Sequence, residues 1–147
     1  MEIIDGKALA KKVRENLKNE VEKLREEGII PKFAVILVGS DPASLTYVKS
    51  KNNACKELGI EYEEALLDEN ITMKELLSII DSLNERKDIS GILLQSPIPK
   101  HLDIQEAFRR ISPEKDVDGF NPYNVGRLCL NQDTFVSCTP HRYNENV

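Results

Sequence analysis

The sequence FAVILVGSDPASLTYVKSK, residues 33–51, contains a strand, a turn and the start of a helix in that order. Residues 33–38 are continuously apolar and end at Gly39, which is typical of a buried parallel strand. Asp41 is a good N-cap and Pro42 suits the first helical position, so a helix is predicted to begin there. In open α/β sheets, ligands bind outside the carboxyl ends of the strands, and this helix begins at such an end.

A stripe of polar residues, Ser44, Tyr47 and Lys51, runs along one side of this predicted helix. Tyr47 and Lys51 are one helical turn apart, so a phenol would lie beside a lysine amine. Most such pairs are solvated surface residues without a role in function. A functional interpretation therefore depends on what other segments bring to the same edge of the sheet.

The rest of the chain alternates between helical and strand patterns. Helices are predicted over residues 7–27, from Asp41 to Gly59, from Thr72 through Leu83, and from Asp103 to before Pro113, and further strands over 60–67 and 89–94. The acidic residues in 60–67 indicate an edge strand or one solvated face. This order predicts an α/β fold, a single domain built as a three-layer sandwich with a mostly parallel sheet flanked by helices.

Two later segments also place polar residues next to apolar elements. Residues 91–100, GILLQSPIPK, carry Gln95 after an apolar run, and residues 113–120, PEKDVDGF, carry Asp116 and Asp118. Taken alone, a glutamine at a strand end or an Asp-Gly pair is equally typical of a cap or a turn. Asp116 is interpreted as structural, binding backbone amides in its loop.

With these three segments in order, the chain resembles the methylenetetrahydrofolate dehydrogenase/cyclohydrolase family, the bifunctional folate enzymes often called FolD. The resemblance runs from Ile4-Asp5-Gly6-Lys7 to Cys138-Thr139-Pro140 and includes residues 121–126, whose Asn and Gly precede a short hairpin in the family. It implies a tetrahydrofolate substrate in one-carbon metabolism and purine biosynthesis. The implied reactions are NADP-dependent oxidation of the methylene form and hydrolysis of the methenyl form to 10-formyltetrahydrofolate. A homodimer is implied for the complete enzyme.

The resemblance also implies catalytic roles for three residues. Lys51 matches the proton-transfer lysine, and Tyr47 matches the tyrosine that stacks on the pterin and positions that lysine. Gln95 matches the glutamine that hydrogen-bonds the lysine, and a neutral amide there adds no counter-charge.

Substrate contacts are implied for Ser44, Tyr47, Asp118 and Pro97. Asp118 matches the carboxylate that accepts hydrogen bonds from the pterin ring, a charge-assisted pairing. Ser44 matches a polar neighbour on the same helix, and Pro97 forms part of a rigid cleft wall.

Residues 1–140 are predicted to be the catalytic domain, and residues 141–147 a tail foreign to the family. In the family, the chain continues into a Rossmann domain that binds NADP. Here the glycine expected soon after Pro140 is missing, and Ser137 replaces the usual proline. The tail is interpreted as an engineered boundary or a frameshifted terminus; the latter is favoured because an engineered cut would keep family sequence. With no G-x-G-x-x-G or Walker loop, the NADP-binding domain is predicted to be absent and this chain to have no cofactor site.

Composition fits one soluble domain, since the 147 residues are 40% hydrophobic and 31% charged with a net charge of −5. The acidic balance argues against a nucleic-acid partner, and the lack of a basic leader or long apolar run argues against export and a membrane partner. A cytoplasmic location is expected. The three widely spaced cysteines and two lone histidines predict neither disulfides nor a metal site.

Three functional hypotheses remain open at this point. The first is the catalytic domain of the folate enzyme, and the second is a module that binds folate without turnover. The third, a lyase using Lys51 as a Schiff-base amine, is not supported by the Gln95 and Asp118 segments. Binding of a folate analogue separates the first two from the third, and activity separates the first from the second.

Overall fold

The computed structural model describes residues 6–137 of the protein. Within this range the elements are α1 Gly6–Glu26, β1 Lys32–Val38, α2 Pro42–Leu58, β2 Glu61–Leu67, α3 Met73–Glu85, β3 Gly91–Leu94, α4 Ile104–Arg110 and α5 Pro122–Cys129. The predicted alternation of helices and strands is confirmed, with small shifts at their ends. The predicted tail, residues 141–147, lies outside the described residues.

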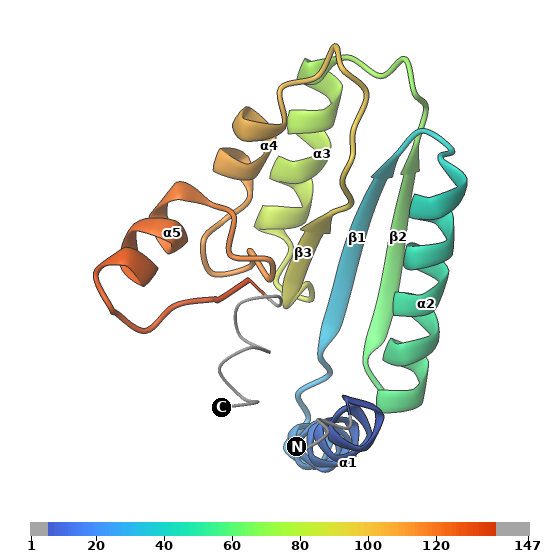
Figure 1. Ribbon diagram of the computed structural model, residues 1–147, viewed down its shortest axis with the longest axis vertical. Coiled ribbons are helices and arrows are strands. Elements are labelled where there is room, and N and C mark those ends of the chain that lie inside the picture. The colour runs from blue at the N-terminus through green and yellow to red at the C-terminus, as the bar shows by residue number, and fades with distance from the viewer. Residues whose placement is uncertain (1–5, 138–147) are drawn as a thin grey trace, which may run out of the picture.

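The sheet is parallel, with the strand order β2-β1-β3. The apolar run of β1 is central and fully covered, whereas the glutamate-rich β2 lies at an edge, as its sequence indicates. Helix α2 covers one face of the sheet, and α3 and α4 cover the other (Figure 1). The α/β class and the three-layer sandwich are thus confirmed.

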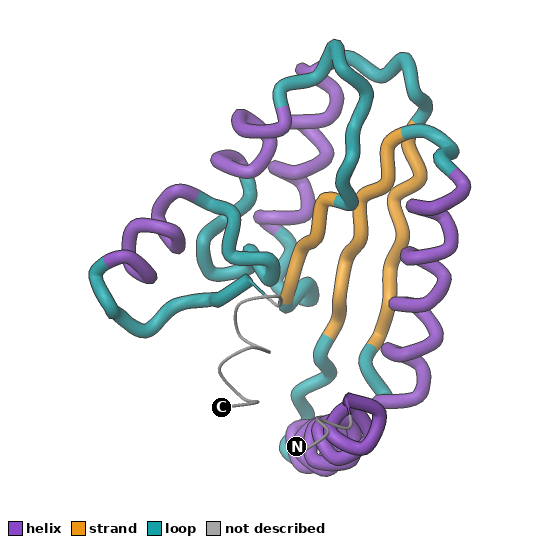
Figure 2. Tube along the Cα trace, in the orientation of Figure 1, coloured by secondary structure: helices purple, strands orange, loops and turns teal. Residues whose placement is uncertain are grey.

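Alternate residues of β1 divide between two apolar cores. Ile36 belongs to the larger core with Leu76 and Ile80 of α3, and Leu37 belongs to the smaller one with Val48 of α2. Loops leave the carboxyl ends of all three strands at the same edge of the sheet (Figure 2). This edge is where the predicted polar residues of α2 and β3 approach one another.

Side-chain caps set the starts of the helices at this edge. The Asp41 carboxylate accepts a 2.8 Å hydrogen bond from the Ser44 backbone N–H, with Pro42 at the first turn of α2. Thr72 and Glu75 form a reciprocal capping box at the start of α3. Both caps are as the sequence predicts, because they depend only on residues a few positions apart.

The hairpin implied after Gly126 is not formed within the described residues. Helix α5, capped by Asn121, continues past Gly126 to Cys129. Its C-cap is Leu130, and the next residue, Asn131, has a left-handed φ of 53°. Residues 130–137 contain no strand, so this part of the expectation was wrong for the described chain.

An ion-pair cluster lies where β1 and β2 begin, opposite the edge that holds the loops. The Glu63 carboxylate of β2 contacts the Lys32 ammonium at 2.9 Å and an Arg86 guanidinium nitrogen at 2.9 Å. Asp88 contacts both of these cations as well. Hydrogen bonds from Arg86 and then Lys32 lower the pKa of Glu63 to about 2.

This pKa shift predicts a loss of stability in acid. Because the folded-state pKa of Glu63 lies below its ordinary value of 4.5, its contribution is present above pH 4.5 and is lost as the pH falls toward 2. Glu63→Gln should lower the free energy of unfolding by about 1 kcal/mol at pH 7, since the cluster is partly solvated. Urea unfolding at pH 7 and pH 3 checks this, with the exposed Glu57→Gln as control. An equal deficit for Glu63→Gln at both pH values would contradict the assignment.

Candidate active site at the carboxyl edge of the sheet

A lysine from α2 meets a glutamine from the end of β3 at the predicted edge. Gln95 follows β3 directly, and its backbone N–H donates to the Ile36 carbonyl at 2.8 Å, which anchors it to β1. The Lys51 Nζ donates to the Gln95 Oε1 at 2.8 Å. The structure therefore brings together two residues that lie 44 positions apart in the sequence.

The amide group of Gln95 is held in one orientation. Its Nε2 donates to the Ser96 carbonyl at 2.7 Å, which turns the Oε1 toward Lys51. The next peptide bond, Ser96–Pro97, is cis, and Pro97 is exposed beside the pair. Gln95 thus presents an uncharged acceptor to the lysine amine.

Asp118 lies in a partly buried loop within electrostatic range of Lys51. Burial raises the pKa of the Asp118 carboxyl, and the charge of Asp116 raises it further, while the charge of Lys51 acts in the opposite direction. The loop is joined to the sheet by a bridge between Ile92 and Asp116. Residues from α2, the end of β3 and this loop therefore surround one region.

The two other residues of the α2 stripe differ in exposure. Tyr47 is 64% exposed, so its ring is available to a ligand, whereas Ser44 is only 2% exposed. The backbone N–H of Ser44 and then its hydroxyl hydrogen-bond to Asp41 and lower the pKa of that carboxyl. Ser44 thus acts in the helix cap, and a substrate contact by Ser44 stays a prediction.

Three buried polar residues lie next to Asp118 in the fold: Asp116, Asn121 and Asn124. The sequence indicated a structural role for Asp116 but not its side-chain partner. Asp116 accepts a hydrogen bond from the Asn121 backbone N–H at 2.8 Å, which confirms its structural interpretation. Asn124 also donates to Asp116, at 2.9 Å, and this contact was missed. The available signal was an asparagine inside a helix, where its propensity is poor.

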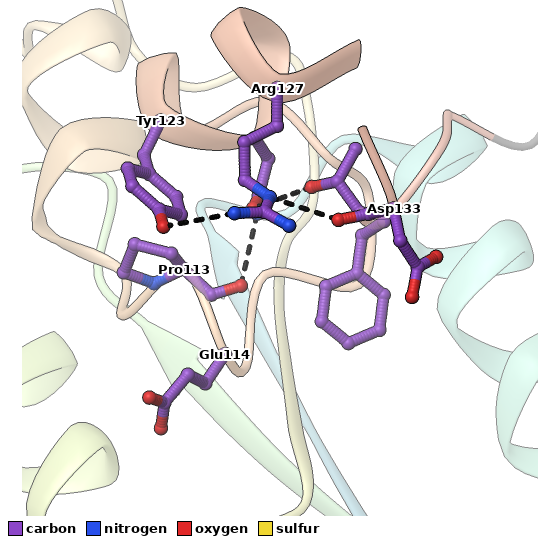
Figure 3. A pocket seen from close by; sticks show the side chains of 8 residues that line it. Pro113, Glu114, Tyr123, Arg127 and Asp133 are labelled. Carbon is purple, nitrogen blue, oxygen red and sulfur yellow. Dashed lines mark hydrogen bonds between the residues drawn. The ribbon is translucent and has the colours of Figure 1, made fainter. Parts of the chain in front are cut away.

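A pocket of about 340 Å³ lies beside α5, where Tyr123 and Arg127 line it together with Asp133 (Figure 3). Neither Lys51 nor Gln95 lines this pocket. The residues that line it contact one another. Arg127 donates to the Asp133 carbonyl at 2.9 Å, and its guanidinium carbon lies 5.7 Å from the centre of the Tyr123 ring. Because the residues of this pocket bond to one another, we assign it a structural role. The candidate active site is placed at Lys51, whose amine can transfer a proton and is held by Gln95.

Within residues 6–137, no three His, Cys, Asp or Glu side chains are grouped so that they could hold a metal ion. In the same range, Cys55 is a buried free thiol and Cys129 an exposed one. None of the helices in the described chain is both long and apolar enough to cross a membrane.

A parallel α/β domain with a lysine–glutamine pair at the carboxyl edge of its sheet has the arrangement of a ligand-binding or catalytic domain of the open α/β class. Residues 4–118 match the family model described as tetrahydrofolate dehydrogenase/cyclohydrolase, catalytic domain. This match covers most of the chain, so the protein belongs to the tetrahydrofolate dehydrogenase/cyclohydrolase family.

Individual relatives agree with this family. The bifunctional protein FolD of Nautilia profundicola is 54% identical over 140 residues, which are 95% of this chain and 49% of that protein. FolD of Methanococcoides burtonii is 55% identical over 139 residues, 94% of this chain and 49% of that protein. The chain therefore spans about half the length of the curated relatives it matches.

Solved structures show the same relation. The bifunctional enzyme FolD from Campylobacter jejuni, 46% identical, superposes with a TM-score of 0.97 over 99% of this chain and 52% of that chain. FolD from Trypanosoma brucei, solved with NADP cofactor and an inhibitor, is 34% identical with a TM-score of 0.91 over 98% of this chain and 50% of that one.

Proposed function

We propose that this chain is the folate-binding catalytic domain of an enzyme that interconverts 5,10-methylene-, 5,10-methenyl- and 10-formyl-tetrahydrofolate. The complete enzyme would act by NADP-dependent oxidation followed by hydrolysis. The observation that carries this proposal is the hydrogen bond from Lys51 to Gln95 beside Asp118, in a chain of this family. The resemblance makes a homodimer and a cytoplasmic location the expectations for the complete enzyme.

The hydrolytic step can be assigned to residues of this chain. The methenyl cation is already electrophilic, so the protein must orient it and remove a proton from the attacking water. Lys51 is the proposed base, because Gln95 fixes its amine without adding a negative charge. The exposed Tyr47 ring, one helical turn from Lys51, is the proposed surface on which the pterin stacks.

Asp118 is the proposed anchor for the pterin. An amino-pyrimidinone edge presents two neighbouring N–H donors, which suit a carboxylate with two acceptor oxygens. The raised pKa of the free Asp118 reflects its burial, and a ligand that donates to this carboxylate would stabilise its charged form. Ser44 and Pro97 are proposed to complete the substrate contacts.

The starts of helices α2 to α5 do not fit the phosphates of NADP. A dinucleotide needs free backbone N–H groups at a helix start, but Asp41 already accepts from the Ser44 backbone N–H of α2. The starts of α3, α4 and α5 are likewise capped by Thr72, Asp103 and Asn121. We therefore derive no hydride-transfer step from this chain, and propose that it is inactive or very weak alone.

This predicts that the 147-residue chain does not bind NADP. The starts of α2 to α5 are capped by side chains of the chain itself, and two of these caps are carboxylates that repel phosphate. Titration of NADPH, followed by its fluorescence, should show no saturable binding up to about 1 mM. The Trypanosoma brucei relative, which was solved with NADP cofactor, is the positive control. Saturable micromolar binding to this chain would show a cofactor site that its structure does not reveal.

The alternative is a module that binds folate without turnover. Calorimetry with 5-formyltetrahydrofolate, a stable reduced folate, tests the binding that both hypotheses share. Hydrolysis of methenyltetrahydrofolate, measured in a protein completed with the second half of a relative, then separates them. Binding without hydrolysis above the spontaneous rate would favour the module.

A further inference from the structure

The loop that carries Asp118 is wedged between β3 and the segment that ends the described chain. A Cβ atom on Gly91 of β3 would lie 2.5 Å from a Val117 methyl carbon, so no side chain fits there. On the other side, a Cβ on Gly119 would lie 2.6 Å from the Phe135 carbonyl oxygen, and its φ is +67°. The backbone on both sides of the loop therefore limits where Asp118 can lie.

Asn124 of α5 links the three segments around this loop. Its Nδ2 donates to the Pro113 carbonyl at 3.0 Å and to the Asp116 Oδ2 at 2.9 Å. Its Oδ1 accepts from the Thr134 hydroxyl at 2.9 Å. Asn124 is 3% exposed and Asp116 is 2% exposed. The polar atoms of this amide thus have hydrogen-bond partners in three segments: Pro113 at the start of the loop, Asp116 within it, and Thr134 in the outgoing segment that follows α5.

The Thr134 hydroxyl has a specific part in this arrangement. It donates to the oxygen of the Asn124 amide, whose Nδ2 end is set by two groups that can only accept, the Pro113 carbonyl and the Asp116 carboxylate. With the amide reversed, its oxygen would face the Asp116 carboxylate, and two acceptors would be opposed at a buried position. Thr134 therefore satisfies the buried Asn124 Oδ1 and connects the outgoing segment to the amide that binds Asp116, two residues before Asp118.

We propose that Thr134 and Asn124 form a clamp that positions Asp118 for the substrate. The proposal rests on the proposed function, because it takes Asp118 to be the pterin anchor. Neither clamp residue contacts the substrate; both act through the backbone of residues 116–118. The pocket beside α5 is the space around this clamp, since Asn124 and Thr134 line it.

The test uses Thr134→Val, which removes the hydroxyl and keeps the shape of the side chain. Binding of 5-formyltetrahydrofolate to the chain is measured by calorimetry, and stability by thermal unfolding. We expect Thr134→Val to raise the Kd about three- to tenfold, the effect of one misplaced hydrogen bond. The control is Ser82→Ala, which removes an exposed hydroxyl bonded within α3 and should leave the Kd unchanged.

A double-mutant cycle separates positioning from general destabilisation. In an Asp118→Asn background, Thr134→Val should change the Kd less than twofold, while its effect on the melting temperature persists. The same increase in Kd in both backgrounds, or no increase in either, would overturn the clamp. If Asp118→Asn weakens binding and Thr134→Val does not, only the clamp fails. The proposed function of this site fails if the unaltered chain does not bind the folate, or if Asp118→Asn binds it as well as the unaltered chain does. In either case the clamp proposal fails too, because it depends on Asp118 as the anchor.

Discussion

Lys51→Met should reduce the hydrolysis of methenyltetrahydrofolate by at least about 100-fold, because a positioned general base contributes that much or more. The measurement needs a protein completed with the second half of a relative such as the Nautilia profundicola enzyme. Methionine keeps the length and much of the volume of the lysine chain but cannot transfer a proton. Rates are corrected for spontaneous hydrolysis, which is otherwise mistaken for residual catalysis.

Binding provides the internal check on this prediction. The Kd for 5-formyltetrahydrofolate should change far less than the rate, since Lys51 is proposed to act in the chemistry. The matched control is Lys49→Met, an exposed lysine on the same helix whose loss should leave the rate unchanged. A near-normal rate for Lys51→Met would remove the lysine from the mechanism. Equal losses of rate and affinity would reduce it to a binding residue.

The elements that the sequence predicts well are those whose cause is local. Residues 34–38 are buried because the run is apolar throughout, and Asp41 begins α2 because its carboxylate reaches an N–H only three residues away. The edge position of β2 likewise follows from its glutamates. None of these features needs knowledge of a distant segment.

The candidate site could be predicted only in part from the residues themselves. The rule for strand ends placed Lys51 and Gln95 at one edge, but their pairing came from the family resemblance, since helical spacing says nothing about a partner 44 residues away. Ser44 shows the limit of the stripe argument, because residues of one helical stripe differed from 2% to 64% in exposure. Asn124 was missed because its partners come from three separate segments.

The failure of the expected hairpin has a similar cause. The resemblance implied a short hairpin after residues 121–126, but Asn121 is the N-cap of α5 and its Nδ2 also donates to the Ile111 carbonyl at 2.8 Å. That tertiary contact fixes the start of the helix. A Cβ atom at Gly126 would meet no other atom within 4 Å, and the helix continues through this residue to Cys129.

Asp118→Ala should weaken the binding of 5-formyltetrahydrofolate by about 1.5 to 3 kcal/mol, or roughly 10- to 150-fold in Kd, because hydrogen bonds to a charged group are lost. The comparison variant is Asp116→Ala, which should act mainly on stability and raise the Kd less than Asp118→Ala does, since Asp116 accepts from Asn121 and Asn124 within the protein and affects the ligand only through the clamp. Calorimetry gives the affinity and thermal unfolding the stability of each variant. Unchanged affinity in a folded Asp118→Ala protein would contradict the pterin anchor. A greater loss of affinity for Asp116→Ala at equal stability would move that role to Asp116, which its burial and its satisfied hydrogen bonds argue against.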